Sequence, residues 1–95
     1  MTMFVFKIFV AGLSPRNKDL IASFRETCST RLGEKYQIQV IDILKDPAKA
    51  DEKKILATPT IIREKPMPEK RIIGDFRENS QSQQALNFLT EDISN

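Results

Sequence analysis

The side chains able to carry out chemistry are few in this sequence. Its 95 residues include one cysteine, Cys28, and no histidine. A lone cysteine cannot close an internal disulfide, and a chain without histidine lacks the commonest general base and the commonest metal ligand. The three glycines are scattered, so no glycine-rich loop is available to hold a phosphate group. We therefore expect a protein that is not an enzyme and that has no metal or cofactor site.

The charge pattern excludes further classes of partner. The net charge is +2, and basic residues alternate with acids, as in KDPAKADEKK at residues 45–54, so nucleic acid is not expected as a partner.

No apolar run approaches the ~20 residues that cross a membrane, and the apolar N-terminal stretch lacks the basic start of a signal peptide. A single cysteine fits a reducing compartment. We expect one cytoplasmic domain that spans residues 1–95.

A strand and a long helix are predicted at the start of the chain. Residues 4–10, FVFKIFV, are apolar at nearly every position, which is typical of a central strand. Ser14 is a good N-cap and Pro15 suits the first helical position. Gly33 supplies a left-handed stop to the helix. The helix repeats apolar residues at every fourth position, which predicts a buried face and an inert, buried thiol: Leu20, Phe24, Cys28 and Leu32.

A second strand and a short helix follow. Residues 36–44, YQIQVIDIL, alternate at first and then become continuously apolar, which predicts a half-covered strand. A strand, a helix and a further strand in succession form a right-handed unit, so this strand should run parallel to the first. Asp46 and Pro47 repeat the signature of a cap followed by proline. They predict a short polar helix that ends near Leu56.

Two short strands and a last helix complete the prediction. The strands are expected at residues 60–64 and 70–75, separated by KPMPE, where two prolines make a stiff turn. Ser80 and Gln83 have the spacing of a capping box for the last helix. That helix places apolar residues on one face, namely Ala85, Leu86, Leu89 and Ile93.

The predicted order, β-α-β-α-β-β-α, is that of the thioredoxin-like sandwich. In this fold a cis-proline precedes the third strand, and Pro59 in KILATPTII occupies that place. A trans proline that merely begins the strand is the alternative. We expect Pro59 to define the fold and not to take part in catalysis. In redox proteins of this fold the loop after the first strand carries reactive cysteines, but here it reads LSPRN, so disulfide exchange is not expected.

Four blocks of the sequence occur together in a characteristic order and spacing. They read FVAG, VIDILKDP, KILATPTII and RIIGDF. Together they resemble the signature blocks of the KaiB family of small circadian-clock proteins, and the resemblance covers almost the whole chain. The positions that match the family motifs are Gly12, Asp42, Pro47, Thr60, Gly74 and Asp75.

The resemblance implies a non-catalytic regulator that binds the N-terminal ATPase lobe of a hexameric KaiC-family protein. It implies KaiA or a sensor histidine kinase as further partners. It also implies two folds: the thioredoxin-like monomer that binds KaiC, and a dimer or tetramer whose C-terminal half is rearranged. The loop LSPRN, and Gln39 at a position where lysine is common, depart from the cyanobacterial pattern. A stress-related system therefore fits the sequence as well as a circadian clock.

A partner surface is suggested by the second strand, which the fold places at the sheet edge. The segment YQIQV has no proline or lysine to block pairing with another strand. We hypothesise that Gln37 and Gln39, with Arg16 and Lys18 at the start of the first helix, face the KaiC-family partner. The alternative is that these are ordinary solvent-facing positions.

Two other functions remain open from the sequence. One is a glutathione-binding thioredoxin-like module, with Ser14 at the helix N-terminus, although the N-cap role accounts for this serine. The other is a KaiB-like sensor domain related to clock histidine kinases, although no kinase segment follows Asn95.

Overall fold

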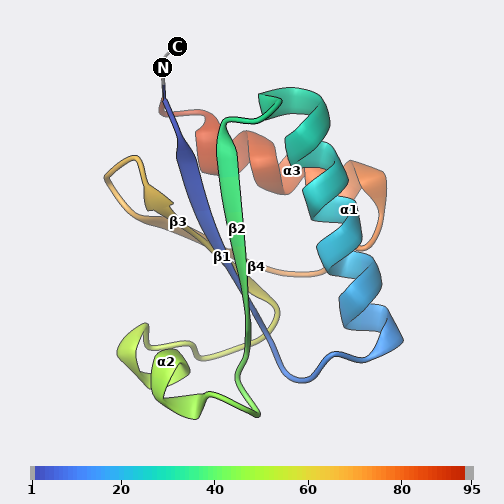
Figure 1. The fold of residues 1–95 in the computed structure, drawn as a ribbon, viewed down its shortest axis with the longest axis vertical. Coiled ribbons are helices and arrows are strands. Elements are labelled where there is room, and N and C mark those ends of the chain that lie inside the picture. Colours follow the sequence, from blue (N-terminus) through green and yellow to red (C-terminus); the bar gives the residue numbers. More distant parts are fainter. Residues whose placement is uncertain (1, 94–95) are drawn as a thin grey trace.

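A four-stranded sheet forms the centre of the molecule. The structure is a computed structural model that describes residues 2–93. The strands stand in the order β2-β1-β3-β4 (Figure 1). β1 pairs in parallel with β2 and antiparallel with β3, and β3 pairs antiparallel with β4. Their bounds are Phe4–Val10 (β1), Tyr36–Asp42 (β2), Thr60–Lys65 (β3) and Lys70–Ile73 (β4).

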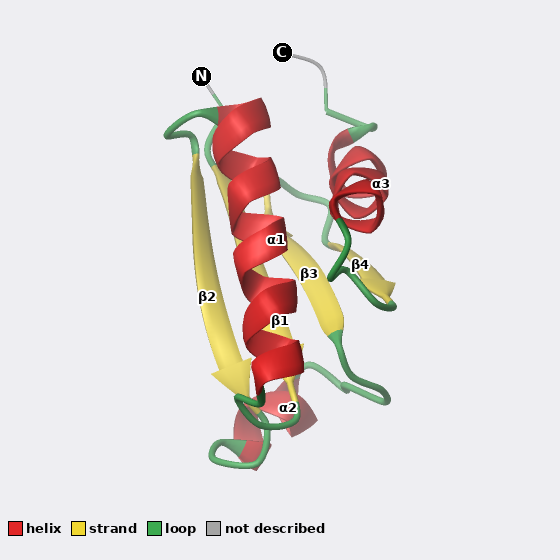
Figure 2. Ribbon diagram, turned by 90° about the vertical axis from the view of Figure 1, so that its right-hand side faces the viewer, coloured by secondary structure: helices red, strands yellow, loops and turns green. Residues whose placement is uncertain are grey.

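Two helices cover one face of this sheet. They are α1 (Pro15–Leu32) and α3 (Asn79–Thr90), which lie side by side in front of the strands (Figure 2). The short helix α2 (Pro47–Glu52) lies at one end of the sheet (Figure 1). Within residues 2–93, no helix is both long and apolar enough to cross a membrane. The predicted order β-α-β-α-β-β-α is confirmed, and with it the thioredoxin-like class.

The alternation of β1 divides the core into two parts. Its even-numbered side chains are buried beneath the two helices, where Phe6 meets Phe24 of α1 edge to face with ring centroids 5.4 Å apart. Phe9 points to the other face and packs with Ile41 and Ile62 in a smaller cluster. Because both faces of β1 carry buried apolar side chains, the strand has to lie inside the sheet and not at an edge.

Local signals set both ends of α1. The Ser14 hydroxyl accepts a hydrogen bond from the Asn17 N–H at 3.2 Å, and Pro15 opens the first turn, as predicted. At the other end the Gly33 N–H donates to the Ser29 carbonyl at 3.1 Å. Gly33 has the expected positive φ of 63°, which favours glycine, but its ψ of −118° lies outside the left-handed helical region.

The second strand is shorter than the sequence predicted. It ends at Asp42 and not at Leu44, because the Asp42 carboxylate accepts the Leu44 N–H at 3.0 Å and turns the chain. Leu44 is 71% exposed, so its apolar character does not mark a buried strand position. The apolar pattern of residues 36–44 therefore predicts the strand correctly only as far as the turn at Asp42.

The ends of α2 and α3 also differ from the prediction. α2 ends at Glu52 and not near Leu56, because Lys54 adopts a positive φ of 53° that a helix cannot accommodate. Asp46 makes no capping hydrogen bond and instead pairs with Lys49 at 3.5 Å. The capping box of α3 is formed by Glu78 and Gln81, not by Ser80 and Gln83, so the helix begins two residues earlier than the serine suggested.

Leu20 and Leu56 offer a matched test of this core. Leu20 is 2% exposed in α1, whereas Leu56 is 93% exposed. Leu20→Ala should lower the free energy of unfolding by about 2–5 kcal/mol, because it leaves a cavity among packed side chains. Leu56→Ala should change it by less than about 0.5 kcal/mol. Urea unfolding followed by circular dichroism measures both, and equal losses would contradict the assignment of the core.

Candidate partner-binding surface

The loop between β1 and α1 carries no thiol, and the single cysteine lies elsewhere. Cys28 is fully buried on the inner face of α1. Burial raises the pKa of its thiol to about 12, against the smaller opposing effect of Arg25 and Arg31. Disulfide exchange requires an accessible thiolate of low pKa. Cys28 is therefore part of the core, where its thiol is neither accessible nor readily ionised.

Gly12 and Asp42 join the loops that follow the two parallel strands. The Gly12 N–H donates to Asp42 Oδ1 at 2.9 Å, and the Asn17 side-chain amide donates to the Gly12 carbonyl at 2.7 Å. Gly12 has a φ of 88°, a conformation that side chains rarely adopt. Asp42 thus fixes the backbone of the neighbouring loop, which accounts for a carboxylate at the end of a strand. Pro47 lies further along and begins α2.

Pro59 and Thr60 lie where β3 begins. The Thr58–Pro59 peptide bond is cis, and the Pro59 carbonyl accepts the Gly74 N–H at 3.2 Å. The Thr60 hydroxyl is buried and donates to the Ala57 carbonyl at 2.6 Å. The first hydrogen bond joins the start of β3 to the end of β4, and the second holds the segment that leads into β3. The motif positions Thr60 and Gly74 therefore both have hydrogen-bond partners within the fold.

Asp75 follows Gly74 and forms an ion pair in the loop that leads to α3. Its carboxylate accepts hydrogen bonds from the Arg77 side chain at 2.7 Å and from the Arg77 backbone N–H at 3.0 Å. Arg16 in the first turn of α1 approaches it at 3.4 Å. The Arg77 side-chain hydrogen bond, helped by the backbone N–H, lowers the pKa of Asp75 to about 2. The carboxylate is thus charged at neutral pH and holds this loop near α1.

The four predicted partner-facing residues do not form one patch. Gln37 and Gln39 are exposed on the sheet face opposite α1, because the residues that alternate with them pack toward the helices, namely Tyr36, Ile38 and Val40. Arg16 and Lys18 are exposed at the start of α1. A 2.6 Å hydrogen bond between Ser29 and Tyr36 places the start of β2 beside the end of α1. The start of α1 is therefore about 20 Å away, along 13 residues of helix.

The outer edge of β2 presents unpaired backbone groups. The Phe4 N–H donates to the Lys35 carbonyl at 3.0 Å and the Ile43 N–H donates to the Val10 carbonyl at 2.9 Å, so odd-numbered residues of this segment bond to β1. The N–H and C=O groups of Tyr36, Ile38 and Val40 consequently point away from β1, with no backbone partner among residues 2–93. The sequence pattern indicates the glutamine side chains but not these backbone groups, although the predicted parallel pairing of β1 and β2 implies this alternation.

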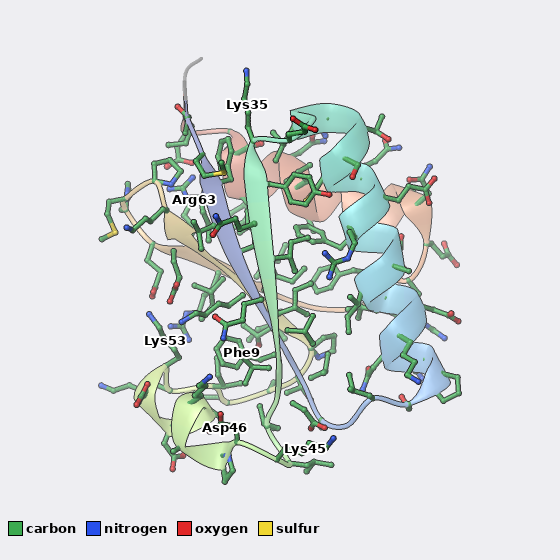
Figure 3. All side chains as sticks on the ribbon, viewed as in Figure 1. Phe9, Lys35, Lys45, Asp46, Lys53 and Arg63 are labelled. Carbon is green, nitrogen blue, oxygen red and sulfur yellow. The ribbon has the colours of Figure 1, made fainter. Side chains whose placement is uncertain are left out.

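The sheet face opposite α1 and α3 carries a network of ion pairs. Lys7 in β1 pairs with Glu64 in β3 at 2.9 Å. Lys53, which follows α2, pairs with Glu64 at 3.1 Å and with Glu69 at 2.9 Å. Arg71 in β4 donates to the Lys53 carbonyl at 2.9 Å. Figure 3 shows Lys53 reaching from the end of α2 along this face. We call these five residues the charged sheet face.

Native Cys28 should be unreactive. At pH 8, we expect its reaction with a thiol reagent such as Ellman's reagent to be on the order of 1,000-fold slower than in denatured protein, because a pKa of about 12 leaves few thiolates. Reaction rates in buffer and in guanidinium chloride test this, the denatured chain being its own control. A native rate within tenfold of the denatured one would contradict the buried position.

Asp75 should titrate far below an ordinary carboxyl group. Because its folded pKa of about 2 lies below the unfolded value of about 3.9, its contribution to stability is present above pH 4 and is lost as the pH falls toward 2. Arg77→Met should raise this pKa strongly, and Arg16→Met should raise it only slightly, because Arg16 is the weaker partner. Carbon-13 NMR of the Asp75 carboxyl group measures this pKa in the original protein and in both variants. Equal shifts in the two variants would refute the assignment.

Comparison with known proteins places the chain in a family. A family model described as the KaiB domain matches residues 7–88. The circadian clock protein KaiB3 of Synechocystis sp. is 34% identical over 93 residues, which are 98% of this chain and 91% of that protein. The circadian clock oscillator protein KaiB of Prochlorococcus marinus is 38% identical over 91 residues, which are 96% of this chain and 78% of that protein.

Solved structures agree on the fold. The N-terminal domain of Synechococcus elongatus SasA matches with a TM-score of 0.76 at 14% identity, over 100% of this chain and 90% of that chain. A Malassezia sympodialis thioredoxin, Mala s 13, matches with a TM-score of 0.68 at 23% identity, over 90% of this chain and 76% of that chain. At these identities the likeness shows the thioredoxin-like fold alone. From the family model and the relatives in sequence, the chain belongs to the KaiB family.

Proposed function

We propose that this protein is a non-catalytic regulator that binds the N-terminal ATPase lobe of a KaiC-family hexamer in a circadian or stress-related signalling system. Membership of the KaiB family and relatives named circadian clock proteins support this role. The position at which the thioredoxin-like fold carries its reactive thiol reads Leu13–Ser14–Pro15 here, and Cys28 is buried. What the fold offers to a partner is therefore a surface.

The observation that carries the proposal is the unpaired edge of β2. Tyr36, Ile38 and Val40 direct N–H and C=O groups outward, and no proline or lysine within β2 blocks a strand from pairing there. An extended segment of a partner gains main-chain hydrogen bonds at such an edge, and flanking side chains supply specificity. Gln37 and Gln39 flank the edge on the face opposite α1, and we assign them that role.

Further contacts belong to the same proposal. Arg16 and Lys18, about 20 Å from the start of β2, would form a second and separate contact with the large ATPase ring. KaiA or a sensor histidine kinase would be additional partners where the organism has them. A dimer or tetramer is expected for the protein alone. Pro59, whose carbonyl bonds Gly74, serves the shape of the domain in this scheme.

The alternative functions gain no support. The Ser14 hydroxyl accepts the Asn17 N–H and caps α1, which accounts for a serine at this position. A glutathione-binding module would need that hydroxyl for its ligand. The likeness to the SasA N-terminal domain, at 14% identity, concerns the fold and does not favour a sensor role.

A pair of substitutions at Ile38 tests the edge. Ile38→Pro removes the outward N–H, whereas Ile38→Ala shortens the same side chain but keeps that donor. We expect Ile38→Pro to weaken binding to the KaiC-family ATPase of the same organism at least tenfold relative to Ile38→Ala. Surface plasmon resonance with the immobilised hexamer measures the affinities, and circular dichroism verifies that both variants fold. Proline at Gln39 is unsuitable because Gln39 bonds toward β1.

Two results would count against the proposal in different ways. If both Ile38 variants bind equally well, the partner does not use the β2 edge, although the function itself survives. If the unmodified protein binds no KaiC-family ATPase, the proposed function is wrong.

A further inference from the structure

Arg63 in β3 is a charged side chain inside the core. It is 0% exposed and lies on the helix side of the sheet, opposite Phe6 of β1. Figure 3 places it near the end of the sheet that is far from Lys45 and Asp46. A guanidinium group keeps its charge at any pH at which proteins fold, so burial is tolerated only when the group is paired.

The partners of Arg63 come from two separate segments of the chain. Nη1 donates to Asp92 Oδ1 at 2.6 Å and to the Leu89 carbonyl at 2.8 Å, and Nη2 donates to Asp92 Oδ2 at 2.9 Å. Nη2 also donates to the Pro68 carbonyl in the β3–β4 turn. Nε has no partner among the described residues. One buried side chain thus joins the end of α3 to the turn of the hairpin.

Asp92 supplies the negative charge of this arrangement. Its two oxygens bind the guanidinium side by side, the strong geometry for such a pair. The adjacent acid, Glu91, approaches Lys70 at 3.5 Å and is 63% exposed, so it does not compensate Arg63. Lys70 lies 3.6 Å from Asp92 and adds a weaker attraction. The Arg63 hydrogen bonds hold the pKa of Asp92 well below its ordinary value.

The first half of α3 is held by other contacts. The Ser82 hydroxyl is buried, donates to the Phe76 carbonyl at 2.7 Å, and lies 2.8 Å from the Ser23 hydroxyl of α1. Ala85 and Leu86 continue this contact with the core. None of these contacts involves Arg63. The last turn of α3 is joined to the sheet by other contacts, namely Arg63 to the Leu89 carbonyl at 2.8 Å and Lys70 to the Phe88 carbonyl at 2.7 Å.

We propose that Arg63 and Asp92 form a latch, and that withdrawal of the Asp92 carboxylate opens the last turn of α3 and the β3–β4 turn together while β1, β2 and α1 stay folded. A buried cation without its anion is costly, and local opening lets water reach Arg63 at the smallest loss of packing. Opening exposes Leu89 and its apolar neighbours. A partner that binds Asp92 with its own cationic group would thereby uncover an apolar surface.

Neighbouring acids provide a matched test. Asp92→Asn and Glu91→Gln each remove one negative charge from consecutive residues without a large change in shape. We expect Asp92→Asn to speed amide hydrogen exchange at residues 86–93 and 65–70 at least tenfold, with exchange in β1 and β2 unchanged. Glu91→Gln should leave exchange in all four regions unchanged. Mass spectrometry of peptides after timed exchange measures this on the full chain.

A second substitution separates the latch from general loss of stability. In the Asp92→Asn background, Arg63→Met removes the buried cation and should return exchange at both turns to within about threefold of the original protein, because an apolar side chain needs no anion. The latch is wrong if Asp92→Asn behaves like Glu91→Gln, or if it speeds exchange in β1 and β2 equally or fails to fold. It is equally wrong if the double variant stays open.

Discussion

β1 has to bury side chains on both faces while its backbone bonds to strands on both edges, and the rest of the fold satisfies these two demands. Its even-numbered residues pack beneath α1 and α3, and Phe9 packs with Ile41 and Ile62 on the other face. The chain returns through α1 to place β2 in parallel on one edge, and β3 closes the other edge in the antiparallel direction. The outer edge of β2 is then left available, and this is where we locate the partner.

Local patterns predicted most of the architecture and failed where a single polar contact decides. The apolar run of β1 and the cap at Ser14 are signals that act within a few residues, and the structure confirms both. The end of β2 and the start of α3 depend on the carboxylates of Asp42 and Glu78, and the partners of these carboxylates cannot be predicted from the periodicity of apolar residues. The burial of Arg63 could not be predicted either, because an arginine in a short strand indicates a solvent-facing position until its anion is known.

The candidate partner-binding surface is likewise only partly predictable from the sequence. The side-chain pattern indicates Gln37 and Gln39, whereas the groups that point outward from the edge are backbone atoms of the residues that alternate with them. Finding them requires the register of β1 against β2, which is a property of the assembled sheet. Of the motif positions, Gly12 bonds to Asp42 and Gly74 bonds to Pro59 between separate segments, whereas Thr60 bonds within its own segment. The stretch that begins β3 therefore maintains the shape of the domain through the Pro59–Gly74 hydrogen bond.

The charged sheet face has a consequence for how copies of this protein meet one another. Two sheets pack face to face when apolar side chains interdigitate across a dry interface about 10 Å thick. Here a second sheet would have to strip water from Lys7, Lys53 and Glu64, whose ion pairs are satisfied within one molecule and gain nothing from a neighbour. The face without α1 and α3 thus discourages stacking at high concentration. Self-association by sandwich formation is therefore disfavoured on this side.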